Sequence, residues 1–236
     1  MKPVYRAPLY HFLQFLDRND LIRIDQKSIL DCGAGGVTPA LGLFYEHGFA
    51  THGIDISDEQ IALAHAFENK YAMQLNLQKG DMRAIPFPDD HFDFVFEVYS
   101  MVHLSKVDIQ KTLSEMKRIL KPNGICFVSF MSSDSFPLEG EERGLGEIHG
   151  IEFGNPALHS VFSNQEALSF VSNWKILHMF KLLVYSPDIL QAMTEKKWQQ
   201  YYKDHNLITN ETDWSLAYLQ RLERWQFDHL FFILQK

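Results

Sequence analysis

The stretch Ser28–Pro39, SILDCGAGGVTP, decides the fold. Apolar residues run into an acid, Asp31, and three glycines follow within the next five positions. Glycine is needed where a turn takes a positive φ or where a ligand lies against the main chain. A strand that enters such a turn and continues as a helix presents backbone N–H groups to a ligand. The stretch therefore predicts a ligand-binding turn between a strand at 28–32 and a helix at 37–47.

The rest of the chain alternates between strand and helix patterns, which is typical of a doubly wound, mostly parallel α/β sheet. Capping boxes that begin with Ser57 and Ser163, and a serine cap at Ser105, predict three helix starts. Strands are expected at 28–32, 51–57, 75–79, 92–98, 125–130, 174–185 and in the final stretch DHLFFILQ. No linker interrupts this pattern, so we predict a single domain over residues 1–236.

Four regions of this domain differ in pattern. Residues 25–131 carry the regular alternation and are the expected cofactor-binding core. Residues 1–20 read as an amphipathic helix that covers the site. The glycine-punctuated stretch 132–160 reads as a loop, and 187–225 reads as a helical insertion before the last strand. We expect both insertions on the substrate side, where their aromatic residues either line an acceptor pocket or simply pack the inserted segments.

Composition excludes several functional classes. The chain has 236 residues, of which 46% are hydrophobic, and a net charge of −8, which argues against a nucleic-acid partner. No stretch resembles a signal peptide or a membrane span. Cys32 and Cys126 lie in apolar strand patterns, and no zinc-ligand spacing is present. We therefore expect a cytoplasmic protein with no metal and no membrane partner; the sequence does not indicate an oligomeric state.

Acids follow three successive strands. Asp31 ends the first strand, Asp55 ends the second about twenty residues after the glycines, and Asp81 follows the third. The carboxyl ends of parallel strands form one crevice, so these acids should meet there. A carboxylate at Asp55 can accept the hydroxyls of a ribose, and one at Asp81 can accept an adenine amino hydrogen.

The nature of the ligand follows from the acid beside the turn. A nicotinamide-dinucleotide fingerprint requires a third glycine or alanine where Thr38 stands. A dinucleotide also brings a pyrophosphate, which Asp31 would repel. An acid at that position suits a ligand with an ammonium or sulfonium group, so the pattern favours S-adenosylmethionine over a dinucleotide.

Four segments carry a family resemblance: ILDCGAGGVTP, GIDIS, GDMRAIPFPDDHFDFVFEVYSMVHL and RILKPNGICFVSF. Over about Ile29–Phe130 the chain resembles the class I S-adenosylmethionine-dependent methyltransferases. The resemblance implies a Rossmann-like sheet of seven strands with the last one antiparallel. It also implies S-adenosylmethionine as cofactor and in-line methyl transfer to a small molecule. One departure is Val37, where many members carry glycine or another small residue.

The resemblance further implies which residues bind the cofactor. They are Asp31, Cys32, Gly33, Ala34, Gly35, Asp55, Ile56, Gln60, Asp81, Met82, Glu97 and Val98. Glu97 and His103 are the candidate catalytic residues, since Glu97 ends the fourth strand and His103 lies in the loop expected beside the transferred methyl group. A histidine there can accept a proton from the acceptor, or it can merely hydrogen-bond the loop backbone.

Two other functions stay open at the level of sequence. The chain can be a non-catalytic S-adenosylmethionine-binding sensor or subunit, in which the same residues bind the cofactor without turnover. An NAD(P)-dependent oxidoreductase fits less well, for the reasons given at Thr38 and Asp31.

Overall fold

The computed structural model describes residues 3–21, 27–135, 140–152, 155–185 and 226–236, together with the single positions 196, 199, 200, 203 and 214. The expected insertion at 187–225 therefore lies almost entirely outside the described residues, as do most of the aromatic side chains assigned to it. Everything below concerns the described part of the chain.

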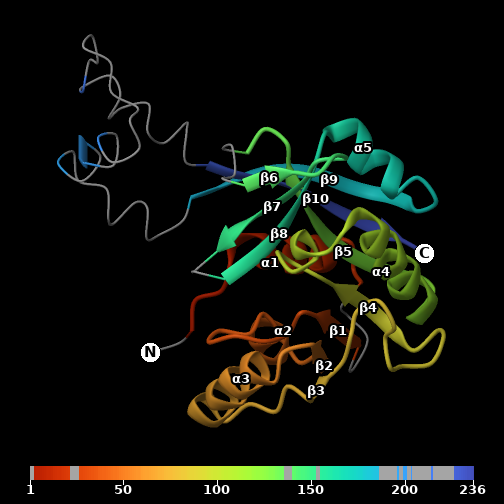
Figure 1. Ribbon diagram of the computed structural model, residues 1–236. Coiled ribbons are helices and arrows are strands. Elements are labelled where there is room, and N and C mark those ends of the chain that lie inside the picture. Colours follow the sequence, from red (N-terminus) through yellow and green to blue (C-terminus); the bar gives the residue numbers. More distant parts are fainter. Residues whose placement is uncertain are drawn as a thin grey trace.

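A seven-stranded central part of a ten-stranded sheet, in the order β3-β2-β1-β4-β5-β10-β9, organises the described part of the molecule (Figure 1). Its strands are β1 (Ser28–Cys32), β2 (Ala50–Asp55), β3 (Leu77–Lys79), β4 (Phe92–Phe96), β5 (Leu120–Ser132), β9 (Lys175–Tyr185) and β10 (Gln226–Gln235). The pairs from β3 through β5 are parallel, whereas β10 runs antiparallel to both β5 and β9. The predicted sheet with an antiparallel last strand is confirmed.

Helices cover both faces of this sheet, as a doubly wound fold requires. They are α1 (Ala7–Arg18), α2 (Leu41–Glu46), α3 (Asp58–Tyr71), the 3₁₀ turn η1 (Met101–His103), α4 (Lys106–Ile119) and α5 (Asn164–Phe170). The serines predicted to cap three of them, Ser57, Ser105 and Ser163, each accept a hydrogen bond from the backbone N–H three residues on. These caps fix where α3, α4 and α5 begin.

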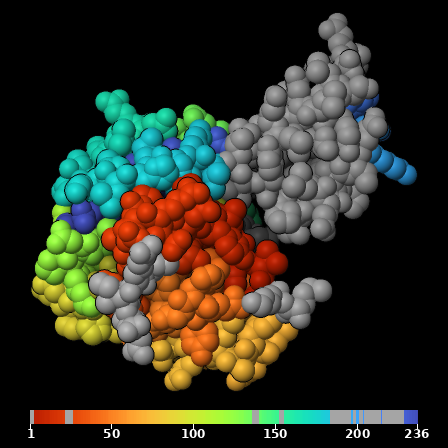
Figure 2. All heavy atoms as spheres, turned by 180° about the vertical axis from the view of Figure 1, so that it is seen from behind, coloured from red at the N-terminus to blue at the C-terminus, as the bar shows by residue number. Residues whose placement is uncertain are grey.

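Side chains that alternate along the strands pack into two separate hydrophobic cores, one on each face of the sheet. Phe94, Phe96 and Phe127 face α1, α2 and α3, while Val95 and Val128 face α4 and α5. Phe12 of α1 stacks on Phe127 with ring centroids 4.7 Å apart. Seen from the back of the molecule, α1 (red) lies between β9 (cyan) and the α2 region (orange) (Figure 2). The apolar face of α1 is therefore part of the core, and its role as a cover over the site stays a prediction.

The stretch expected as a loop, 132–160, is instead mostly sheet. It forms the antiparallel strands β6 (Gly140–Glu142), β7 (Glu147–Glu152) and β8 (Asn155–Phe162). β8 also pairs with Met131 and Ser132 of β5, beyond the point where β4 has ended. Main-chain hydrogen bonds rather than a regular apolar pattern hold these strands, which is why the sequence pattern did not reveal them.

The helix expected at 37–47 is shorter than predicted. It begins at Leu41, after Ala40 in the capping position. Pro39 disfavours helical geometry at the residue before it, so Thr38 cannot belong to the helix. Residues 35–39 consequently remain an open turn at the edge of the sheet, where the candidate site lies.

Candidate functional site

The glycine turn after β1 is fitted closely to its neighbours. Gly33 has φ +114°, and a Cβ built there would lie 2.2 Å from the Ser100 hydroxyl. A Cβ on Gly35 would lie 2.6 Å from a carboxylate oxygen of Asp55. The Gly33 N–H donates to the Ile54 carbonyl at 2.8 Å, which ties the turn to β2. Side chains are excluded here both by backbone conformation and by space.

Asp31 lies at the end of β1 with only 3% of its surface exposed, yet it borders the cavity described below. Burial raises the pKa of its carboxyl group well above the usual value, and the nearby charges of Glu97 and Asp55 act in the same direction. Arg6 acts in the opposite direction. A cationic ligand group would offset the cost of this buried carboxylate.

Asp55 is held rigidly at the end of β2. One carboxylate oxygen accepts the Gly35 N–H at 3.0 Å, and the other accepts the Ser57 N–H at 2.9 Å. An ionised carboxylate has about four acceptor positions, so two remain for a ligand. The glycine turn is thus joined to the carboxylate that the sequence assigned to the ribose.

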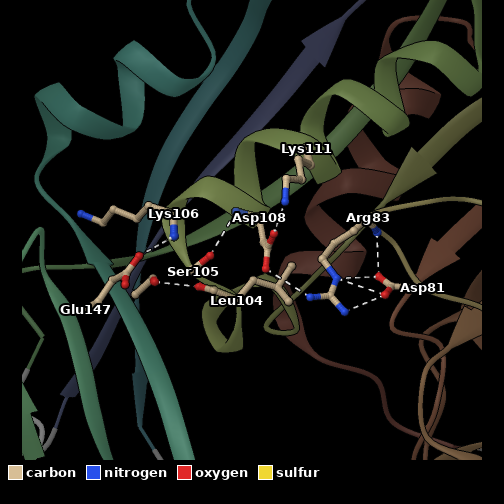
Figure 3. Close-up of polar contacts among 9 residues, drawn as sticks. Asp81, Arg83, Leu104, Ser105, Lys106, Asp108, Lys111 and Glu147 are labelled. Atoms are coloured by element: carbon tan, nitrogen blue, oxygen red, sulfur yellow. Dashed lines mark hydrogen bonds and ion pairs between the residues drawn. The ribbon is translucent and has the colours of Figure 1, made fainter. Parts of the chain in front are cut away.

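Asp81 is engaged by a neighbour that the sequence analysis did not consider. Arg83 donates to its carboxylate from the backbone N–H at 2.8 Å and from the guanidinium at 2.7–3.1 Å. The third guanidinium nitrogen, Nη1, donates to Asp108 at the start of α4, at 3.1 Å (Figure 3). Hydrogen bonding from Arg83 lowers the pKa of Asp81, which therefore stays ionised and fixed in orientation.

These groups border one cavity of about 990 Å³ at the carboxyl ends of β1, β2 and β4. Most of the residues predicted to bind cofactor lie on its wall: Asp31, Gly33, Gly35, Asp55, Ile56, Gln60, Asp81, Met82 and Val98. His103 lies there too. Cys32, Ala34 and Glu97 do not, because they are buried behind the wall. Tyr5, Arg6, Tyr99 and Ser100 also border it and were not predicted.

Glu97 is not on the cavity wall, and its carboxylate binds the loop that follows β4. It is fully buried, and one of its oxygens accepts the backbone N–H groups of Ser100 and, at 2.8 Å, of Met101. The other oxygen lies 3.4 Å from the Ser129 hydroxyl. Burial raises the pKa of Glu97 to about 7. Its position fits a group that shapes the loop better than one that touches a substrate.

The loop held by Glu97 contains a strained residue. Tyr99 has φ +71°, a conformation that bulky side chains rarely adopt. Its N–H donates to the Ser129 hydroxyl at 2.9 Å, and its ring borders the cavity. Strain of this kind persists where surrounding contacts dictate the conformation, often at functional sites.

His103 ends η1 and borders the same cavity. Its Nδ1 lies 3.1 Å from the Leu158 carbonyl of β8. A neutral imidazole that donates from Nδ1 carries its lone pair on Nε2. The geometry suits either a base or a loop anchor, so the catalytic role of His103 stays a prediction.

The strand order, the glycine turn and the acids at the strand ends define a Rossmann-like fold of the methyltransferase class. A family model described as a methyltransferase domain matches residues 30–128. The solved structure of a protein from Pyrococcus horikoshii superposes with a TM-score of 0.63 at 17% identity, covering 98% of this chain and 92% of that one. An S-adenosylmethionine-dependent methyltransferase from Methanosarcina mazei gives 0.62 at 17% identity, covering 90% and 93%.

Curated relatives also match in sequence. A methyltransferase of Bacillus subtilis is 34% identical over 100 residues, which cover 42% of this chain and 38% of the relative. A sterol 24-C-methyltransferase of Gibberella zeae is 32% identical over 99 residues, covering 41% and 26%. This chain thus spans less than two fifths of either relative. Over residues 30–128 it is similar to methyltransferase domains.

Two features are absent from the described residues. None of their helices is both long and apolar enough to cross a membrane. Nor do they bring together three or more histidine, cysteine or acidic side chains that could hold a metal ion.

Proposed function

We propose that this protein transfers the methyl group of S-adenosylmethionine to a small-molecule acceptor. The observation that carries the proposal is that Asp31, Asp55 and Asp81 border a single cavity around the glycine turn. Such a set of acids at successive strand ends suits a ligand that combines an ammonium or sulfonium group with a ribose and an adenine.

The residues of the turn fit this cofactor. None of the described residues donates a hydrogen bond to the Asp31 carboxylate, which leaves this buried acceptor for a ligand cation. Asp55 retains acceptor positions for ribose hydroxyls. Ile56, 60% exposed, and Met82 offer apolar surface on the wall where a planar base would be covered.

When bound, S-adenosylmethionine supplies an electrophilic methyl group, so the chain need not provide covalent chemistry. Its residues must hold the acceptor in line and exclude water. His103, whose Nδ1 lies 3.1 Å from the Leu158 carbonyl, would accept a proton from an acceptor hydroxyl or ammonium if it acts as a base. Tyr99 and Ser100 border the same cavity as His103 and would form part of the acceptor surface.

A small-molecule acceptor is supported by size and by relatives. Pockets for small ligands span about 300–1,000 Å³, so a cavity of about 990 Å³ has room for the cofactor and a small partner. Several matching relatives are named as sterol 24-C-methyltransferases. These short alignments favour a small organic acceptor without assigning a sterol to this chain.

Calorimetry with Asp55→Asn tests the cofactor assignment. The variant keeps the shape of the side chain but removes its charge. Hydrogen bonds to a charged group contribute about 1.5–3 kcal/mol, so affinity for S-adenosylmethionine should fall about ten- to a hundredfold. Asp58→Asn is the matched control, since Asp58 lies three residues on in α3, is exposed and does not border the cavity. Preference of the wild-type protein for NAD, or unchanged affinity in Asp55→Asn, would contradict the assignment.

Turnover is tested separately. Wild-type protein with methyl-labelled cofactor should transfer label to a component of a fractionated metabolite extract and release S-adenosylhomocysteine. Tight cofactor binding without transfer to any fraction would instead favour the non-catalytic sensor or subunit.

A further inference from the structure

Among the described residues, one basic side chain on the cavity wall has no hydrogen bond or ion pair. Three basic side chains border the cavity: Arg6, Arg83 and His103. Arg83 is committed to Asp81 and Asp108, and His103 contacts the Leu158 carbonyl. Within the described part of the chain, the guanidinium of Arg6 makes no hydrogen bond or ion pair. Its contact is with the Tyr99 ring, whose centroid lies 4.8 Å from the guanidinium carbon.

The backbone of Arg6 on the cavity wall is positioned by the residues around it. It occupies the capping position of α1, whose apolar face is buried in the core. The preceding residue, Tyr5, packs against α2 so closely that a Cβ on Gly42 would lie 2.5 Å from its hydroxyl. The guanidinium also rests on Tyr99, a cation–π contact that keeps the charge in place. The Arg6 guanidinium therefore lies on the cavity wall beside Tyr99.

Arg6 lies close enough to Asp31 for their charges to interact. The Arg6 charge opposes the rise in the pKa of Asp31 that burial causes, although no ion pair joins the two side chains. The buried Asp31 carboxylate and the Arg6 guanidinium thus border one cavity, close enough to interact electrostatically without a direct ion pair between them. An amino-acid group carries its ammonium and carboxylate on one carbon and would complement both charges.

We propose that Arg6 binds the α-carboxylate of the cofactor's methionine moiety, opposite Asp31 at its ammonium group. This inference rests on the proposed function and adds a specificity-determining residue to it. The planar guanidinium can donate two parallel hydrogen bonds to a carboxylate, a geometry that a lysine cannot reproduce. Together, Asp31 and Arg6 would distinguish S-adenosylmethionine from analogues that lack either charge.

The test compares two cofactors in calorimetry: S-adenosylmethionine and its decarboxylated form, which keeps the sulfonium and the amine. Arg6→Gln should weaken binding of S-adenosylmethionine about ten- to a hundredfold and change binding of the decarboxylated form by less than about twofold. Arg6→Lys should recover only part of the loss. Arg18→Gln, at the other end of α1 and away from the cavity, should leave both affinities unchanged.

The possible outcomes test the role of Arg6 and the proposed function separately. If Arg6→Gln weakened binding of both cofactors equally, Arg6 would only maintain the structure of the site, and the inference would be overturned. Unchanged affinity for S-adenosylmethionine with a raised KM for an acceptor would overturn it in favour of an anionic acceptor. A wild-type protein that binds neither cofactor would remove the proposed function itself.

Discussion

Replacing Glu97 by glutamine should abolish a pH dependence of folding stability that the native carboxylate creates. Glu97 is fully buried and accepts backbone hydrogen bonds from Ser100 and Met101, which hold the loop with Tyr99 at φ +71°. Glutamine has the same shape. Its amide oxygen can accept the same N–H groups, and its NH₂ can donate to the Ser129 hydroxyl. It therefore mimics the protonated glutamic acid at every pH.

The size of the effect follows from the raised pKa. In the folded protein the pKa of Glu97 rises from 4.5 to about 7, chiefly through burial. Between these values the folded state binds more protons than the unfolded state, so stability falls as pH rises. At 1.36 kcal/mol per pKa unit, the wild-type protein should lose about 3 kcal/mol relative to Glu97→Gln between pH 4.5 and pH 8. Above about pH 7 the difference should become constant.

Urea denaturation of both proteins at pH 5, 6, 7 and 8, without cofactor, measures this difference. Ionisable groups that do not interact with Glu97 cancel in the comparison. Asp31 does not cancel, because the Glu97 charge raises its pKa, and its contribution changes the stability gap in the same direction. Glu142→Gln is the control, since this exposed carboxylate on β6 has similar surroundings in the folded and unfolded chain. A stability gap between wild type and Glu97→Gln that does not change with pH would refute the reasoning, and so would a gap of the opposite sign.

Two further predictions concern the cavity. Gly35→Ala should weaken S-adenosylmethionine binding more than about tenfold and destabilise the fold by about 1–3 kcal/mol, because the new Cβ would lie 2.4 Å from Cβ of Gln60 and 2.6 Å from a carboxylate oxygen of Asp55. Gly48→Ala, with open space around it, should leave the affinity unchanged in calorimetry. A Gly35→Ala protein that still binds S-adenosylmethionine tightly would contradict the close fit of the turn. His103→Ala should slow the chemical step about 10²–10⁴-fold if His103 is a base, and single-turnover rates should lose their rise towards alkaline pH. Near-normal turnover would leave His103 as an anchor to Leu158.

The sequence predicted those parts of the fold that depend on local pattern. The strand at 28–32, the serine caps at Ser57, Ser105 and Ser163, and the antiparallel final strand are all confirmed. Strand β10 alternates Phe231 and Ile233 towards one core with Leu230 and Phe232 towards the other. A few neighbouring residues determine each of these features, so hydrophobic periodicity and capping residues predict them.

The parts that were missed depend on partners distant in sequence. Glu97 was expected to face the cavity, but the backbone N–H groups of Ser100 and Met101 turn its carboxylate inward. Arg6 comes to the site because α1 packs across the sheet, a contact that no local pattern encodes. The strands β6, β7 and β8 were not predicted, because they pair through main-chain groups. In addition, β8 pairs with a part of β5 that lies beyond the end of β4.

The position of β10 between β5 and β9 also has a consequence for how the chain is made. Phe130 of β5 pairs with Leu230 of β10, so 230 − 130 gives a sequence separation of 100 residues. At about 5–20 residues per second, a ribosome needs roughly 5–20 seconds to add that segment. During this interval the edge of β5 that later pairs with β10 lacks that partner strand. Phe127 and Phe130, which are buried in the folded protein, lie on this strand. Nascent chains should therefore depend on chaperone protection of that edge, and slow synthesis across residues 133–225 should promote aggregation rather than folding.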